Sequence, residues 1–255
     1  EDSNQTSITN GSTSSSNNSL SNSGAAYVYV RSGTTWTQQA YIKAANAGTS
    51  DSFASILKLS GDTLTIGAKL EDSNQTSITN GSTATTDNSN TDSGAVYVYK
   101  RTGTTWTQEA YIKASNAGAN DQFGSDLAIY GNTLAIGATN EASNQTSITN
   151  GSTASTDNSL SEAGAVYIYS RGGTSWAQQA YIKPSNAHSY LYFGQGGPSQ
   201  IDLYDDTLLV GVDDDLSNQT SITNGTGSSA NTSYSAAGAA FIYRRTGTTW
   251  AQEAY

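Results

Sequence analysis

Short runs of alternating apolar and polar residues recur along the chain and predict β-strands. One repeat period contains four of them, AVYVYKR at 95–101, TWTQEAYIK at 105–113, DLAIY at 126–130 and TLAIGA at 133–138. Gly131-Asn132 separates the last two runs, and such a pair suits a two-residue hairpin turn with positive φ. No window has sustained helical periodicity. The pattern therefore predicts an all-β chain made of four-stranded antiparallel units.

The alternation also predicts which side chains share a face of the sheet. On the strand at 105–113, Trp106 is expected beside Ala110 and Ile112, with Tyr111 on the opposite face. In the strand at 95–101, valines alternate with tyrosines, so both faces carry large packing residues. Sheets covered on both sides in this way are typical of blades that stack around an axis.

A polar decapeptide is copied four times, together with all of these strand signals. SNQTSITNGST occurs at 73–83 and 143–153, and shorter copies begin at Ser3 and Ser217. Its first asparagines are spaced by 70, 70 and 74 residues, and the four tryptophans keep the same intervals; they are Asn4, Asn74, Asn144 and Asn218, and Trp36, Trp106, Trp176 and Trp250. A long period with a complete set of strands inside it predicts a propeller or a solenoid.

The period divides the chain into three full units and a leading half unit. The predicted units are a half blade with its leading loop at 1–51, and blades at 52–121, 122–192 and 193–255. The last blade carries a four-residue insertion between Phe193 and Thr207. Insertions belong in surface loops, so this blade should differ locally. The half unit predicts an unpaired sheet edge that missing sequence or a neighbouring chain must cover.

Two stretches resemble a known family, the FG-GAP repeat. They are FGSDLAIYGNTLAIGA at 123–138 and GAVYIYSRGGTSWAQQAYIKPSNA at 164–187. The resemblance implies tandem four-stranded blades of a β-propeller, as in integrin α-subunits and in bacterial secreted or surface proteins. It also implies rings of about seven blades. About 3.5 blades would then form a partial ring or an open stack, and a rotation that fails to close gives a fibre.

The charge balance and composition exclude several classes of partner. The formal net charge is −10, which disfavours nucleic acid and anionic lipid. The chain has no cysteine, hence no disulfide framework and no thiolate metal site. No apolar run approaches the roughly 20 residues of a membrane helix, so no membrane insertion is expected. The expected location, which follows from the resemblance, is extracellular or at the cell surface.

The decapeptide has three interpretations, which the sequence leaves open. The first is glycosylation, because N-x-S/T sequons recur twice per copy, at Asn4, Asn10, Asn74, Asn80, Asn144, Asn150, Asn218 and Asn224. The second is calcium, the candidate cofactor. The third is a self-satisfied Ω-type loop, in which Asn, Ser and Thr side chains bond their own backbone and an isoleucine anchors the loop.

The calcium interpretation has candidate oxygen donors in several units, and its densest acidic cluster is in the last one. Asp213, Asp215 and Ser217 have the alternating spacing that suits a hard cation, although a solvated acidic turn gives the same pattern. The family's integrin-type calcium loop, DxDxDG, is not carried over, because the decapeptide stands at that position and lacks its acidic density.

No arrangement of residues predicts catalysis. His188 is the only histidine, and no pair of carboxylates is fixed across a cleft. The leading prediction is a non-enzymatic extracellular repeat protein, a structural or adhesive component of a surface or fibre. Its expected partners are copies of itself or missing blades of the same chain, with glycans or surface proteins as further candidates. The alternative is a closed, calcium-ordered propeller that binds a protein or glycan ligand.

Overall fold

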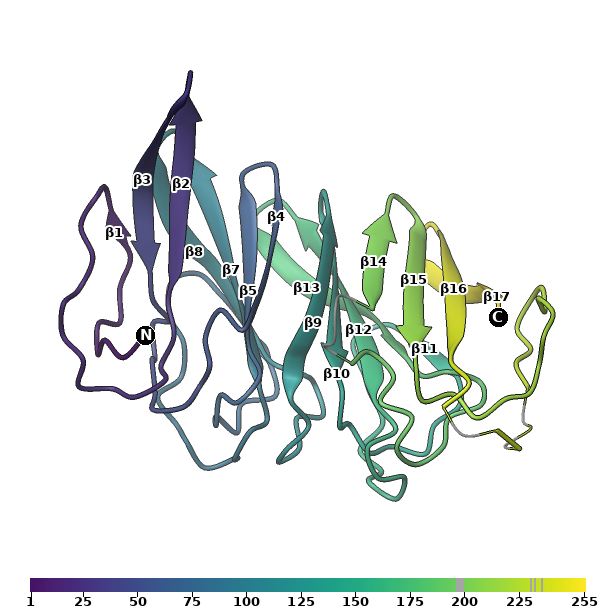
Figure 1. Cartoon of the computed structure of the whole chain (residues 1–255). Helices are drawn as coiled ribbons and strands as arrows, with labels where there is room; N and C mark the ends of the chain where they lie inside the picture. The colour runs from purple at the N-terminus through teal and green to yellow at the C-terminus, as the bar shows by residue number, and fades with distance from the viewer. Residues whose placement is uncertain (196–199, 230, 232, 235) are drawn as a thin grey trace.

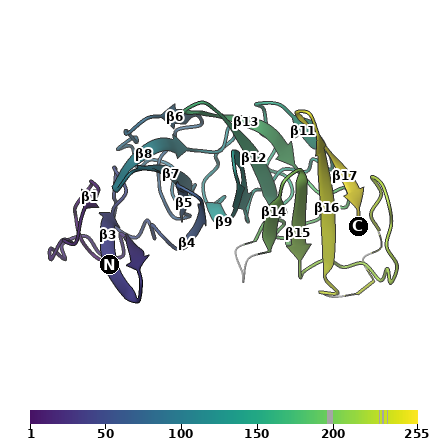
Figure 2. The same ribbon diagram turned by 90° about the horizontal axis from the view of Figure 1, so that it is seen from above.

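The computed structural model describes residues 1–195, 200–229, 231, 233–234 and 236–255. Four antiparallel β-sheets of three to five strands follow one another along the chain (Figure 1). Seen from above, the sheets lie side by side around an arc that does not close, with the two termini at its opposite ends (Figure 2). The predicted all-β fold is confirmed, and the sheets are consistent with propeller blades.

The second and third sheets are complete and have the same topology. The second has the order β4 (Ile56–Ser60), β5 (Thr63–Ala68), β7 (Ala95–Thr102), β8 (Thr105–Ile112) and β6 (Ile78–Asn80). The third has the order β9 (Phe123–Tyr130), β10 (Thr133–Ala138), β12 (Ala165–Gly172), β13 (Ser175–Ile182) and β11 (Ile148–Asn150). The fifth strand of each, β6 or β11, comes from the decapeptide and lies on the outer edge.

The first and fourth sheets are shorter. The first has the order β1 (Thr9–Asn10), β3 (Thr35–Ile42) and β2 (Ala26–Ser32). The fourth has the order β14 (Ile201–Tyr204), β15 (Thr207–Val212), β16 (Ala239–Thr246) and β17 (Thr249–Ala254). The insertion predicted in this last unit falls on residues 196–199, which lie outside the described residues. The inner strand β9 packs against β4 and β14, so the inner edges of the sheets lie together.

The predicted hairpins are confirmed. Tyr130 pairs with Thr133, which leaves a two-residue turn between β9 and β10. The first residue of this turn has positive φ in each of the last three units, 57° at Gly61 and Gly131 and 53° at Asp205. Turns of this kind match the right-handed twist of the strands that they join.

Both faces of the complete sheets are buried, as predicted, but one residue was assigned to the wrong face. Trp106 packs with Tyr97, Tyr99 and Tyr111 against the first sheet, whereas Ala110 belongs to the core on the opposite side. A β-bulge causes the difference: Val98 pairs with Ala110 and Tyr99 pairs with Gln108, so Glu109 is an extra residue. One extra residue reverses the alternation on either side of it.

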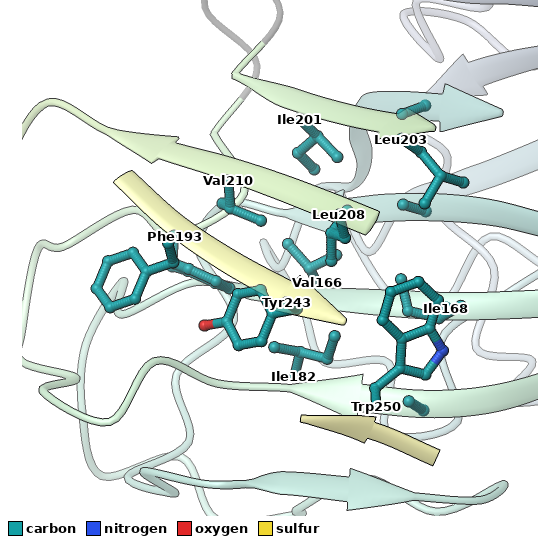
Figure 3. Close-up of a cluster of buried hydrophobic side chains, with 14 of the residues drawn as sticks. Val166, Ile168, Ile182, Phe193, Ile201, Leu203, Leu208, Val210, Tyr243 and Trp250 are labelled. Carbon is teal, nitrogen blue, oxygen red and sulfur yellow. The ribbon is translucent and has the colours of Figure 1, made fainter. Parts of the chain in front are cut away.

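Each gap between sheets is filled by side chains from both neighbours. Figure 3 shows the core between the third and fourth sheets, where side chains of β12 and β13 meet those of β14 to β17. Its labelled members include Val166, Ile168 and Ile182 from the third sheet and Leu208, Val210, Tyr243 and Trp250 from the fourth. Within the described residues, no helix has the length and apolar character needed to cross a membrane.

A close backbone contact joins each sheet to the next at the start of the third strand. Phe123 N–H donates to the Ser93 carbonyl at 3.0 Å, and Gln122 N–H donates to the Asp92 carbonyl at 3.1 Å. Gly94 lies between the two segments with φ of 81°, and a Cβ there would stand 2.1 Å from the Phe123 carbonyl oxygen. Only glycine has both the positive φ and the space that this approach needs.

Candidate functional site

The copied decapeptide forms the outer edge of the first three sheets rather than a separate loop. Its Ile-Thr-Asn segment pairs with the fourth strand of the same unit, with Ile78 opposite Ile112 and Asn80 opposite Ala110. Ile78 is half-buried and packs on the core, as do Ile8 and Ile148 in their own units. The equivalent Ile222 is 77 % exposed, because no further sheet covers it.

The last asparagine of the decapeptide joins its own sheet to the next one. Asn80 Oδ1 accepts a hydrogen bond from Trp176 N–H at 2.7 Å, and Asn80 Nδ2 donates to the Trp176 carbonyl at 3.3 Å. Asn10 makes both bonds to Trp106 at 2.8 and 3.2 Å, and Asn150 makes both to Trp250 at 2.7 and 3.2 Å. An amide side chain can satisfy one backbone donor and one acceptor at once.

The bulge supplies the second half of this junction. Glu109, the extra residue, turns toward the third sheet, and its Oε2 accepts from Trp176 Nε1 at 3.0 Å. The same oxygen lies 3.0 Å from Nη1 of Arg171, whose guanidinium stacks 5.3 Å from the Trp176 ring centroid. The other junctions have neutral glutamines at this position, since Gln39 accepts from Trp106 and Gln179 accepts from Trp250. Bulges commonly redirect a side chain in this way.

An ion pair lies inside each of the first three units, and in the second and third units both of its side chains are buried. Lys113 Nζ is 2.8 Å from Glu71 Oε2, and the two side chains are 0 % and 1 % exposed. Burial lowers the pKa of Lys113, and the adjacent Glu71 carboxylate opposes that shift. Glu71 Oε1 accepts from Tyr111 OH and from Asn46 Nδ2, both at 2.8 Å, so the carboxylate also connects its unit to the preceding one. Equivalent pairs are Lys43 with Glu1 and Lys183 with Glu141.

A second buried carboxyl group lies near the ion pair of the second unit, and another lies near that of the third unit. Asp51 is 3 % exposed and accepts a hydrogen bond from Gly48 N–H at 2.7 Å. Burial is the main cause that raises the pKa of Asp51 to about 7, and the neighbouring Glu71 carboxylate adds to it. Asp121 occupies the same place in the next unit, and burial raises its pKa to about 6.

The calcium candidates are separated by their environments. Asp213 is exposed, whereas Asp215 and Ser217 are buried. Asp215 Oδ1 accepts from Ser217 N–H at 2.8 Å and from Tyr255 OH at 2.9 Å, and Oδ2 accepts from Asn186 Nδ2 at 2.8 Å. Asp215 thus takes the position of Glu71 and Glu141 in its unit. In the described part of the chain, no group of three or more His, Cys, Asp or Glu residues could hold a metal ion. The calcium site stays a prediction.

The glycosylation candidates fall into two groups. The first asparagine of each copy is exposed, and in the described residues no hydrogen bond uses the side chain of Asn74; this group is Asn4, Asn74, Asn144 and Asn218. The second group is Asn10, Asn80, Asn150 and Asn224, and in the first three copies Nδ2 already donates to the next sheet. Glycosylation stays a prediction, and the first group is the more accessible one.

Two functional contacts were missed from the sequence, although each left a signal. Glu and Lys recur 42 residues apart in three units, as in Glu71 and Lys113, which is a fixed spacing that an ion pair explains. The asparagine–tryptophan contact joins residues 96 apart, as in Asn80 and Trp176. The decapeptide and the strand that contains the tryptophan recur with the same period, but no local pattern in the sequence indicates that one contacts the next copy of the other.

A family model described as FG-GAP repeat matches residues 36–99 and 106–169, together just over half of the chain. A search of curated proteins found no match.

Proposed function

Since the chain belongs to the FG-GAP repeat family, we propose that it is a non-enzymatic extracellular repeat protein, a structural or adhesive component of a cell surface or fibre. The observation that carries the proposal is how its repeated polar groups are used. Asn80, Glu109 and Glu71 each bond to a neighbouring sheet, and their equivalents do so in other units. The repeated chemistry therefore supports mechanical connection between units rather than turnover of a substrate.

The outer rim supports the second half of the proposal, a repeated display surface. Each decapeptide exposes its first asparagine at one position per unit, and in the first three units this residue lies shortly before an edge strand that backbone pairing fixes. A partner or a glycan could thus be presented at regular intervals. Identical copies presented on one scaffold favour multivalent contact, in which several weak sites act together.

The test of location is immunogold labelling with an antibody raised against the folded recombinant chain. We expect gold particles on the surface of unpermeabilised host cells or on fibres released from them. An antibody against a cytoplasmic protein of the same host serves as the control for broken cells. Label that appears only after permeabilisation would overturn the extracellular proposal. Loss of attachment to a surface on deletion of the gene would support the adhesive role.

Glycosylation is tested separately on the native material. We expect additional mass at Asn74 and Asn144, and less or none at Asn80 and Asn150, because those amides bond the next sheet. Fragmentation mass spectrometry before and after enzymatic removal of Asn-linked glycans measures each site, because the removal converts the modified asparagine to aspartate and so distinguishes two sequons within one peptide. Unmodified masses at every sequon would contradict this part of the proposal.

A further inference from the structure

The N-terminal end of the arc exposes aromatic residues that are buried in every other unit. Tyr27, Tyr29 and Trp36 are 44 %, 51 % and 63 % exposed. Their equivalents in the second unit are Tyr97, Tyr99 and Trp106, which are at most 2 % exposed because the first sheet covers them. Tyr27, Tyr29, Trp36 and the exposed Arg31 define a head face on β2 and β3.

The C-terminal end exposes the other half of the same junction. Asn224 and Glu253 occupy the positions of Asn80 and Glu109, and both are exposed. Within the described residues, no hydrogen bond engages either of these two side chains. Around them, Leu209 and Ile222 are 40 % and 77 % exposed. These four residues define a tail face on β15, β17 and the last decapeptide.

We propose that the tail face of one copy of this chain binds the head face of a second copy. The contact repeats one that the molecule already makes, the junction between the second and third sheets. There, one asparagine and one glutamate receive the tryptophan and arginine of the following sheet. Across two copies, Asn224 bonds the backbone of Trp36, and Glu253 accepts from its indole.

Charge makes the two faces specific for each other. At the junction between the second and third sheets the bulge residue is a carboxylate, Glu109, and it forms an ion pair with Arg171 at 3.0 Å. The tail face has a carboxylate at the same place, Glu253, and the head face has Arg31 at the position of Arg171. Like charges at this point would repel, so the pair also gives the contact its direction.

The proposed contact between two copies is smaller than a junction between complete sheets, because it lacks the inner strands. The first sheet has the strands β1, β3 and β2 and contributes no inner strands. Smaller interfaces are generally weaker and transient, so we expect a dissociation constant of roughly 10 μM to 1 mM. The inference deepens the proposed structural role, since it names a second copy as the partner, but its test does not depend on where the protein is located.

The test uses two charge reversals, Arg31→Glu and Glu253→Arg, made in separate chains. Sedimentation velocity is run over about 10 μM to 1 mM at low salt, where charge effects are strongest. We expect the wild type to form oligomers as its concentration rises, and each variant alone to remain monomeric because like charges then face each other. An equal mixture should associate again, because opposite charges then face each other at every junction between the two variants. Along such a mixed oligomer, junctions with the natural pair of Glu253 and Arg31 alternate with junctions in which both charges are reversed.

Lys69→Glu is the matched control, because it reverses a charge in the loop after β5, away from both faces. We expect this variant to associate like the wild type, and all variants to keep the wild-type melting temperature. A wild type that stays monomeric through 1 mM would overturn the proposal and leave the faces to other repeats or another protein. Variants that associate as the wild type does, or a mixture that does not recover, would also overturn it.

Discussion

The asparagine that links neighbouring sheets offers the sharpest test of how this chain holds together. Asn80→Ala removes both hydrogen bonds to the backbone of Trp176 and leaves the backbone pairing of Asn80 with Ala110 in place. We expect the junction between the second and third sheets to loosen, while the fold within each sheet persists. The effect should appear as lower stability of the whole chain.

The magnitude follows from the surroundings of the lost bonds. A net contribution of about 0.5–1.5 kcal/mol per hydrogen bond gives about 1–3 kcal/mol for the pair. Trp176 is only 2 % exposed, which places the value toward the upper end, although the exposed Asn80 lets water replace part of the loss. For a chain of this size, about 2–4 °C per kcal/mol converts this to a melting temperature lower by about 2–12 °C.

The decapeptide supplies its own controls for this experiment. Asn74→Ala changes the first asparagine of the same copy, and Asn224→Ala changes the equivalent of Asn80 in the last copy, where the side chain makes no hydrogen bond in the described residues. We expect both to stay within about 1 °C of the wild type at low protein concentration. Calorimetry measures all three, and a transition that splits in two for Asn80→Ala would show that the units now melt separately.

Asn80→Asp refines the interpretation. Its carboxylate can still accept from Trp176 N–H, but the second oxygen then faces the Trp176 carbonyl, where the amide nitrogen donated. We expect this variant to be no more stable than Asn80→Ala. The reasoning is refuted if Asn80→Ala melts with Asn74→Ala and Asn224→Ala, because the side chain would then contribute nothing to the junction.

Three further outcomes follow from differences between the units. Phe241→Tyr should raise the free energy of unfolding in chemical denaturation by about 1 kcal/mol, and a lower value would refute this. The added hydroxyl can donate to the buried, unpaired Asn186 Oδ1, as Tyr167 donates to Asn116 in the preceding unit. Asp51→Asn should have the same free energy of unfolding as the wild type near pH 4 and a value higher by about 2 kcal/mol or more at pH 8, and parallel pH profiles would contradict this. The wild type loses stability as pH rises between about 4 and 7, because the pKa of Asp51 is raised to about 7 in the folded protein. Gly94→Ala should lower the melting temperature far more than Gly238→Ala, and equal losses would rule out the close contact. Both glycines have positive φ, but an added Cβ would lie 2.1 Å from its nearest atom at Gly94 and 3.4 Å at Gly238.

Much of the fold could be predicted because its signals are local. A turn pair such as Gly131-Asn132 and an apolar alternation act within a few residues, and both were interpreted correctly. The face of Trp106 could not be predicted, because the bulge at Glu109 has no sequence signature in a strand of mixed composition. The outer strand that ends at Asn80 was missed as well, since a short polar segment becomes a strand only when another strand is there to pair with it.

The candidate site was harder to predict than the fold because it is built across units. Asp215 is a predicted cation ligand beside Asp213, and the sequence could not show that its side chain also bonds Tyr255 and Asn186, which are distant in the sequence. Asp213 is exposed and Asp215 is buried, and this difference depends on tertiary packing that the local sequence does not report.

The pairing of an asparagine on one sheet with a tryptophan on the next has a genetic consequence. Every complete unit of 70 residues encodes both parts of the joint, the receiving asparagine and the inserted tryptophan. Recombination that duplicates or deletes one whole unit therefore creates or removes a finished joint, and no other residue has to change. A gene of this kind can lengthen or shorten its product in steps of one blade, whereas a break inside a unit leaves an unmatched end.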